Sequence, residues 1–421
     1  MIIEKDSIIK KTCEKWRIEL TVSGSSGELL RINKNNKTQV HMYYTQGWIG
    51  ASVLFNAREV PLRLSGKTLE NSSVCLSCSG HYLALYVDNQ LADEEWPIGL
   101  VDFENAQCHE ARGVVNFFEE PLVKTQPEET KVNITQKWKP LGYNTYVGDC
   151  MPFYDNGVFR LFYLFDRRKH SSKWGLGAHQ WAQISTEDLK NWKSHPLAIG
   201  IDDQKEGSIC TGSVIRNKDK YFAFYAVRTI DHSPALLSCS VSNDGVHFSK
   251  TGKVFTLSER YHSSSARDPC VFKDDNGLFH MLVTTSLGKS EEGNGCLAHL
   301  ESADLEVWNE RDPFFVLDIK DQPECSDYFY YKSFYYLIYS SSGLGRYLIS
   351  KKPFGPWEKP QNNTVIGNCA VVPKSCIWKG ERLLFVSWSP EYLSFGGGML
   401  FHEAKQNLDG TLEFFPLAEI N

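Results

Sequence analysis

Three acidic residues and one arginine stand just ahead of strongly apolar segments in the second part of the chain: Asp149, Arg267, Asp268 and Glu324. A carboxylate at the edge of an apolar strand is costly unless it has a partner or a chemical task. In glycosidases two carboxylates flank the scissile bond, one acting as nucleophile or base and the other donating a proton to the leaving oxygen. Three acids and an arginine at one site would favour that chemistry.

A simpler interpretation exists for each acid taken alone. An aspartate before a proline commonly starts a turn, so Asp268-Pro269 is a weak signal on its own. Glu324 and Asp149 are no stronger singly. The case for a site therefore depends on whether the fold brings the three acids together at equivalent points of a repeated unit.

The elements around these residues have the period of β-strands. Residues 160–165, 221–227, 278–283 and 334–339 are short β-branched or aromatic runs, and tight polar or glycine-bearing turns precede them. Such turns join antiparallel strands. Helical signals are few and short, such as a capped turn predicted at 186–192. The chain is predicted to be all-β.

From about Tyr143 a unit recurs every 50 to 60 residues, and each unit ends in a Ser-containing segment with Trp or Phe. These closing segments are 185–192, 242–248, 302–308 and 350–357, and a last unit covers about 370–388. The spacing is typical of four-stranded propeller blades, whose first strands converge on a central channel. We predict five blades, which would gather the acids at one mouth.

The first 130 residues or so lack this repeat and show alternating segments separated by Gly, Ser and Asn clusters, which predicts a β-sandwich. Residues 85–97 resemble a hairpin of lectin-like sandwiches. The acids Asp93, Glu94 and Glu95 are interpreted as part of a solvated turn.

A charged, Pro-containing linker is expected at 125–131. The predicted domains are therefore a lectin-like β-sandwich at 1–136 and a five-bladed propeller, the catalytic domain, at 137–421. The sandwich is expected to supply no catalytic acid.

From Tyr143 to the end, the chain resembles glycoside hydrolase family 32, the β-fructofuranosidase, invertase and inulinase group. The resemblance lies in the order and spacing of Asp149 before 154–163, Trp174-Gly175, 179–192, Thr211-Gly-Ser-Val, Arg267-Asp268-Pro269 and Glu324-Cys325. It implies a five-bladed propeller and retaining hydrolysis of β-fructofuranosides in short saccharides. Asp149 would be the nucleophile and Glu324 the acid/base, while Asp268 would hold sugar hydroxyls and Arg267 would help to orient them.

The first motif departs from the family pattern, because residues 146–152 read Tyr-Val-Gly-Asp-Cys-Met-Pro where the family has Trp-Met-Asn-Asp-Pro-Asn-Gly. The extra domain also precedes the propeller, whereas the family's sandwich follows it. Two alternatives stay open: a family 43 arabinofuranosidase or xylosidase, which usually works by inversion, and a non-catalytic carbohydrate-binding protein.

Composition limits the partners. Aromatic residues make up 13% of the chain, and Tyr154, Trp174 and Trp388 are candidate sugar platforms. A net charge of −6 argues against nucleic acid as a partner, and the mechanism requires no metal or organic cofactor. Without a signal-peptide core or a span of about 20 apolar residues, the protein is expected to be soluble and cytoplasmic, off the membrane, with reduced, buried cysteines. The oligomeric state is left open.

Overall fold

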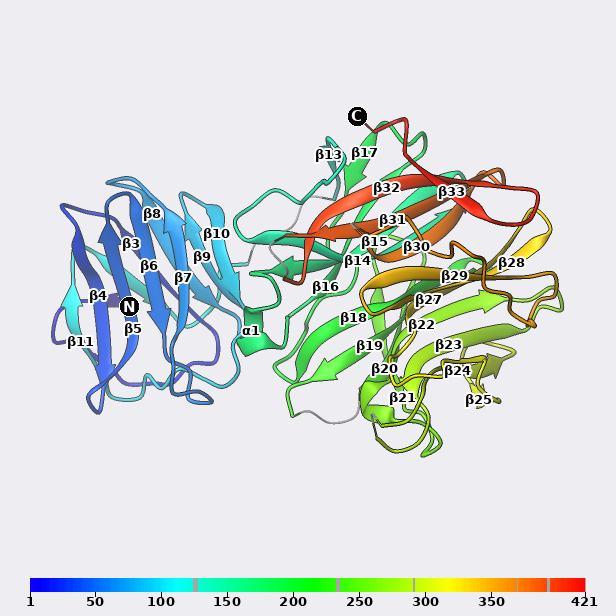
Figure 1. The fold of residues 1–421 in the computed structure, drawn as a ribbon. Helices are drawn as coiled ribbons and strands as arrows, with labels where there is room; N and C mark the ends of the chain where they lie inside the picture. Colours follow the sequence, from blue (N-terminus) through cyan, green and yellow to red (C-terminus); the bar gives the residue numbers. More distant parts are fainter. Residues whose placement is uncertain (124–127, 232–234, 291, 369, 392–393, 421) are drawn as a thin grey trace. The chain divides into compact units, whose positions relative to one another are not determined.

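The computed structural model describes residues 1–123, 128–231, 235–290, 292–368, 370–391 and 394–420. The chain forms two compact units. The first comprises Met1–Thr125, Ser172–Gly175 and Asp202–Gln204, and the second contains the rest (Figure 1). The main division thus follows Thr125, ahead of the boundary predicted at residue 136, and residues 125–127 of the expected linker lie outside the described residues.

The first unit is a β-sandwich. Its strands are β1 (Ile2–Ile3), β2 (Ile8–Ile9), β3 (Trp16–Thr21), β4 (Gly27–Lys34), β5 (Lys37–Thr45), β6 (Trp48–Val53), β7 (Leu62–Lys67), β8 (Ser73–Cys78), β9 (Leu83–Val87), β10 (Gln90–Glu95), β11 (Ala106–Ala111) and β12 (Val115–Phe118). One six-stranded sheet has the order β1-β12-β3-β8-β9-β10 and the other β2-β11-β4-β5-β6-β7. Alternate residues of both sheets form a single apolar core, as the period of two predicts.

The predicted hairpin is present, with β9 and β10 joined at Asp88 and Asn89, both in the left-handed region that such tight turns need. The expectation of a solvated acidic turn is wrong, because Asp93, Glu94 and Glu95 lie in β10 and are buried. Their burial is tolerated because each carboxylate is hydrogen-bonded, Asp93 to the Ser65 amide, Glu94 to the Tyr82 hydroxyl and Glu95 to the amides of Trp96 and Lys173.

The second unit is a β-propeller. Blade one has β13 (Thr130–Val132), β14 (Thr145–Asp155), β15 (Val158–Arg167), β16 (Gln180–Thr186) and β17 (Trp192–Ser194), and blade two has β18 (Glu206–Asn217), β19 (Lys220–Thr229), β20 (Leu236–Ser242) and β21 (Ser249–Phe255). Blade three has η1 (Ser263–Ser265), β22 (Arg267–Lys273), β23 (Phe279–Ser286), β24 (Gly295–Ser302), β25 (Asn309–Glu310) and β26 (Phe315–Val316). Blade four has β27 (Glu324–Tyr331), β28 (Phe334–Ser341) and β29 (Leu344–Ser350), and blade five has β30 (Val371–Trp378), β31 (Arg382–Pro390), β32 (Gly397–Gln406) and β33 (Leu412–Pro416). The all-β, five-bladed architecture with an N-terminal sandwich is confirmed.

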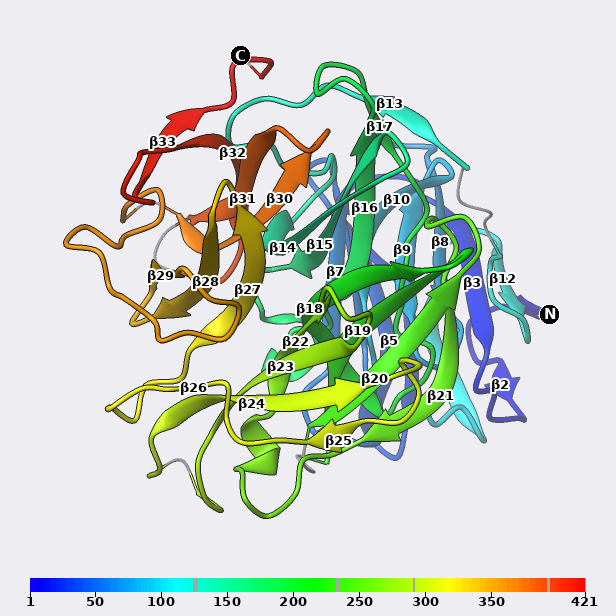
Figure 2. The same ribbon diagram turned by 90° about the vertical axis from the view of Figure 1, so that its right-hand side faces the viewer.

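The inner strands close a ring. Each of β14, β18, β22, β27 and β30 contacts the next, and β30 contacts β14 (Figure 2). Blades one and five are also hydrogen-bonded to each other, since Val147 of β14 pairs with Gly397 of β32 and Trp138 bridges Met399. Apolar clusters fill the spaces between neighbouring blades, for example between blades four and five. The ring therefore sets the five inner strands side by side.

The recurring closing segments are hydrogen-bonded turns, and no helix forms at 186–192. In blade one the Thr186 hydroxyl accepts the amides of Asp188 and Leu189, while the Asp188 carboxylate accepts the two amides that follow. Ser242 with Asp244, and Ser302 with Asp304, repeat the arrangement in blades two and three. The serine and threonine therefore cap a turn here, as they would cap a helix.

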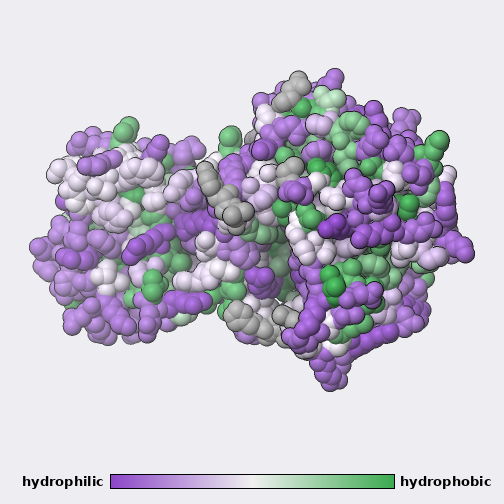
Figure 3. All heavy atoms as spheres, in the orientation of Figure 1, coloured by the Kyte–Doolittle hydropathy of each residue, from purple (hydrophilic) through white to green (hydrophobic). Residues whose placement is uncertain are grey.

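Helical structure in the described residues is limited to η1 and α1 (Ser172–Gly175), where Lys173 and Trp174 have left-handed dihedral angles. None of the described helices is long and apolar enough to cross a membrane. On the face drawn in Figure 3, hydrophilic residues predominate in both units, with apolar residues in small groups. The eleven cysteines in the described part of the chain are all free thiols, most of them buried.

Candidate active site

Every inner strand of the propeller carries a β-bulge near its start. In each bulge, two residues of the inner strand lie opposite one residue of the neighbouring strand, so the inner strand has one extra residue. The residues at the bulges are 148–149, 210–211, 268–269, 325–326 and 372–373. Bulges bend a strand and re-aim its side chains, and they are common beside active sites. Here they define one ring of positions at one end of the inner strands.

The three acids occupy successive register positions of this bulge, not equivalent ones as the repeat predicted. Glu324 directly precedes the bulge of β27, Asp268 is the first bulge residue of β22, and Asp149 is the second in β14. Asp268 and Cys325 have positive φ angles of 54° and 49°. Side chains from three blades are thereby turned toward one another.

Asp149 is 8% exposed and is held at both carboxylate oxygens. The Trp388 indole N–H donates to Oδ1 at 2.9 Å, and the Thr211 hydroxyl donates to Oδ2. The Cys325 thiol lies 3.5 Å from Oδ2. These partners come from blades five, two and four, so the carboxylate of blade one is fixed by its neighbours in a single orientation.

Asp268 is 4% exposed and accepts the Cys325 backbone amide at Oδ2, 3.1 Å away. Burial is the main cause of its raised pKa, and the nearby Asp149 raises it further, while the Arg267 guanidinium, 3.6 Å from Oδ2, opposes the rise. Asp149 and Asp268 thus both contact Cys325, the residue directly after Glu324. The three acids are neighbours in space.

Glu324 is the most accessible of the acids, with a side chain 46% exposed, and its Oε1 accepts a hydrogen bond from Arg267 at 2.7 Å. Arg267 in turn donates to the Ser265 carbonyl and to the Gln322 side chain. The Gln322 amide donates to the hydroxyls of Ser265 and Ser286, at 3.0 and 2.6 Å. The arginine is therefore held in place, and it holds the glutamate.

Glu324 and Arg267 line a hollow of about 670 Å³ in the propeller. Arg228, Lys320 and Asp321 are also at its wall, so its lining is strongly polar. The volume is in the range of small-molecule sites. Glu324 can reach a ligand in this hollow, while Asp149 and Asp268 lie buried next to Cys325.

Of the two predicted aromatic residues in the propeller unit, the structure brings Trp388 to the acids and places Tyr154 away from them. Trp388 contacts Asp149, but Tyr154 lies five residues further along β14, about 16 Å away at 3.3 Å per residue, packed against the apolar cluster of blades one and five. Trp174 belongs to the first unit, packs against the sandwich core, and has the Arg58 guanidinium 4.8 Å above its ring. Both have packing roles.

Two contributors were not assigned by the sequence, Thr211 and Lys374. Lys374 directly follows the bulge of β30, is 3% exposed and donates to the Gly212 carbonyl at 3.0 Å. Burial lowers the pKa of Lys374, but Cys270, Asp327 and more weakly Asp268 outweigh it, so the net shift is upward and the group stays cationic. A lysine inside the apolar run 370–377 was the available signal.

The described chain also offers ligand-type groups outside this ring. Asp166, His170 and His179 form one group, and His280, His299 and Glu301 form another. Neither group includes any of the three acids at the bulges. The candidate active site itself consists of the three carboxylates with an arginine, a threonine and a tryptophan.

The family model for the glycosyl hydrolases family 32 N-terminal domain matches residues 150–369, more than half of the chain. The chain belongs to glycoside hydrolase family 32. Among curated relatives, a sucrose-6-phosphate hydrolase of Bacillus subtilis is 30% identical over 180 residues, covering 40% of this chain and 36% of the relative. One from Zymomonas mobilis is 24% identical over 274 residues, covering 57% and 52%. The chain thus spans about a third to a half of the curated relatives it matches.

Solved structures agree on the fold. Fructan 1-exohydrolase IIa from Cichorium intybus aligns with a TM-score of 0.56 at 17% identity, covering 68% of this chain and 60% of that one. A family 43 β-xylosidase/α-arabinofuranosidase from a compost metagenome has a TM-score of 0.51 at 16% identity, covering 68% and 98%. Propeller shape is thus common to both families, whereas the family model matches family 32.

Proposed function

We propose that the chain is a retaining β-fructofuranosidase that acts on short fructosides. The observation that carries the proposal is the convergence on Cys325, where Asp149 contacts the thiol, Asp268 accepts the amide, and Glu324 is the preceding residue. This places one exposed and two buried carboxyls around one point. Such a set is what a double-displacement glycosidase needs.

In the proposed mechanism, Asp149 attacks the anomeric carbon and forms a covalent glycosyl-enzyme intermediate, while Glu324 protonates the leaving oxygen. Glu324 then removes a proton from water, which releases the sugar. The exposed position of Glu324 gives it access to both leaving group and water. Arg267 keeps Glu324 oriented between these steps, and Asp268 accepts hydrogen bonds from ring hydroxyls.

The substrate is proposed to be a small saccharide, and sucrose 6-phosphate belongs among the candidates because relatives carry that name. A negative net charge supports the absence of a nucleic-acid partner. Free thiols in the described chain support a reducing, cytoplasmic location. The catalytic domain is proposed to be the propeller unit, whose first strand is β13, with the sandwich unit supplying no acid.

The test is a screen of the full chain against sucrose, sucrose 6-phosphate, short inulin and levan oligosaccharides, and aryl arabinofuranosides. We expect the enzyme to release fructose with retention of the anomeric configuration, which NMR detects as the first anomer formed. Retention requires that the carboxyl groups of Asp149 and Glu324 lie about 5–5.5 Å apart. Inversion on an arabinofuranoside alone would instead favour the family 43 alternative.

Glu324→Gln separates catalysis from binding. The variant should lose about 10²–10⁴-fold in kcat on sucrose, because a general acid contributes on that scale. An aryl fructoside, whose leaving group needs no proton, should restore much of the rate. A wild-type protein that binds fructosides but hydrolyses none of them would support the non-catalytic binding alternative.

A further inference from the structure

Three ligand-type side chains converge at the base of the connection between β15 and β16, and none of them is at the inner-strand bulges that carry the three acids. Asp166 lies in β15, His170 in the connection, and His179 directly before β16. The His179 Nε2 atom is 3.2 Å from His170 Nδ1 and 3.0 Å from Asp166 Oδ1, and the three atoms lie within 4.8 Å of one another. Asp166 and His179 are 0% and 4% exposed.

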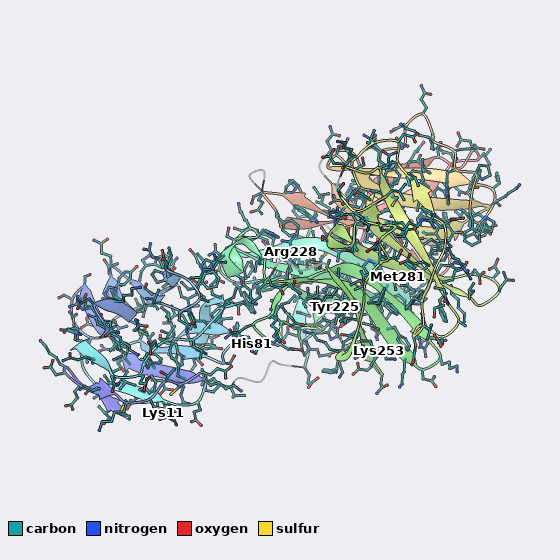
Figure 4. All side chains as sticks on the ribbon, turned by 90° about the horizontal axis from the view of Figure 1, so that it is seen from below. Lys11, His81, Tyr225, Arg228, Lys253 and Met281 are labelled. Carbon is teal, nitrogen blue, oxygen red and sulfur yellow. The ribbon has the colours of Figure 1, made fainter. Side chains whose placement is uncertain are left out.

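Hydrogen bonding alone does not satisfy this arrangement. Arg228, near the end of β19 (Figure 4), has a nitrogen 3.3 Å from His170 Nε2. Because arginine can only donate, Nε2 must accept, and the proton of a neutral His170 then sits on Nδ1 and points at His179 Nε2. That leaves His179 Nε2 without a proton for the Asp166 carboxylate. If His179 Nε2 carries the proton instead, two N–H groups face each other.

We propose that Asp166, His170 and His179 bind a divalent transition-metal ion, with zinc as the best match. A metal accepts lone pairs from all three atoms at once, which removes the conflict between His170 Nδ1 and His179 Nε2 and leaves the His170 proton on Nε2, facing Arg228. Ligand atoms around a tetrahedral zinc at 2.0–2.1 Å lie about 3.3 Å apart, close to the two measured separations. Two imidazoles and one carboxylate favour zinc over magnesium or calcium, which prefer oxygen ligands.

The surroundings support the three ligands. The His170 amide donates to both oxygens of Asp166, at 2.9 and 3.2 Å, and the His179 amide donates to the Ser208 hydroxyl at 3.0 Å. A Cβ on Gly177 would lie 2.9 Å from His170 Nδ1 and 3.0 Å from His179 Nε2. Glycine therefore keeps open the approach that an ion or its fourth ligand needs. Outer contacts that orient ligands are typical of metal sites.

The site would have a structural role. It would tie the two ends of the β15–β16 connection together, in which Arg168, Lys169 and Ala178 as well as His170 have positive φ angles. His179 also stacks on Phe395, with ring centroids 4.7 Å apart, and Phe395 packs against Trp388. The metal would thus support the packing behind Trp388 without taking part in the proposed hydrolysis, and the proposal does not depend on that function.

The test is metal binding to the full chain after dialysis against a chelator. Titration calorimetry should show one equivalent of Zn²⁺ bound, and Co²⁺ should give the visible bands of a tetrahedral site. His170→Ala, which changes a half-buried residue, should weaken binding by more than about 100-fold, beyond the loss typical of an outer-shell contact. Arg228→Gln should tighten binding several-fold, because it removes a cation and the donor to Nε2.

His299→Ala is the matched control. His280 and His299 are also paired, at 2.9 Å, with Glu301 nearby, but one shared proton satisfies that pair, and Glu301 is bound by Arg311. This variant should keep full Zn²⁺ affinity. Equal affinity of wild type and His170→Ala, the absence of a Co²⁺ spectrum, or loss of binding only in His299→Ala would each overturn the proposal. Circular dichroism of every variant verifies folding.

Discussion

All five blades have a bulge in the inner strand, but only blades one, three and four carry a carboxylate at or next to it. Blade two has Thr211 at the position of Asp149, and blade five has Val372 at the position of Asp268. The Val372 φ angle of 49° is close to the 54° of Asp268. The same backbone conformation at the bulge is therefore adopted by an apolar residue in blade five and by an acid in blade three.

The comparison separates two contributions. Each of the five inner strands has one bulge, and the bulges provide positions where side chains can meet. Chemistry then depends on which residue stands at each position and on its register, since Glu324, Asp268 and Asp149 occupy three successive places of the bulge. Blades without an acid still contribute, because Thr211 binds Asp149 and Lys374 of blade five lies buried beside the ring.

The largest loss of activity is expected when the acid of blade one is removed and its side-chain shape is kept. Asp149→Asn should lower kcat by roughly 10³-fold or more, because a neutral amide cannot form the glycosyl-enzyme intermediate. An activated aryl fructoside should not restore the rate. Steady-state kinetics with both substrates check this, and thermal unfolding near the wild-type temperature serves as the folding control. Recovery on the aryl substrate would assign the leaving-group acid to Asp149.

A second test concerns Lys374, the buried cation of blade five, which has no acid at its bulge. Lys374→Met should move the acid limb of the kcat/KM profile to higher pH by less than about one unit. The sign follows because a nearby cation favours the ionised carboxylate, so its loss raises the pKa of Asp268 above its already raised value. Lys374→Arg keeps the charge and should restore most of the profile. A lower rate with an unmoved profile would indicate packing alone.

The acids and their order could be predicted from the sequence, because the repeat is made of local signals. Each closing turn is written in a few adjacent residues, such as Ser302 and Asp304, whose hydrogen bonds are all local. The blade count follows from their spacing. Register within the bulge could not be predicted, because the inner strands have consecutive buried residues around the insertion, which hide the change in alternation that one inserted residue causes.

Tyr154 and the acidic run of β10 show what the sequence could not predict. An aromatic residue near a motif lies near the site only if the strand direction allows it, and Tyr154 is carried away along β14. The buried state of Asp93 depends on the amide of Ser65, and that of Glu94 on the hydroxyl of Tyr82. Such partners become neighbours only when strands pair, so charge alone predicted a solvated turn.

Thr211 offers a smaller test of how a blade without an acid serves the site. Thr211→Val removes the hydroxyl that donates to Asp149 and should lower kcat/KM by about 10- to 100-fold, since a hydrogen bond to a charged group contributes about 1.5–3 kcal/mol. Thr211→Ser should retain most of the activity. Val372→Ala, at the bulge of blade five, is the matched control and should leave kcat/KM close to wild type. Equal effects of Thr211→Val and Val372→Ala would make the threonine contact irrelevant.

The smallest expected effect lies in the closing turns, where blade four again differs. Asp304 accepts the amides of Glu306 and Val307, which lower its pKa, whereas blade four has Lys352 after Ser350 and no acid. A lowered pKa adds stability above the ordinary value, and that stability is lost as pH falls through the lowered one. Asp304→Ala should therefore reduce Tm by about 2 °C at pH 7 and by less near pH 2. Lys352→Ala should show no such pH dependence, and an equal Tm difference at both pH values for Asp304→Ala would mean that the carboxylate charge does not stabilise the turn.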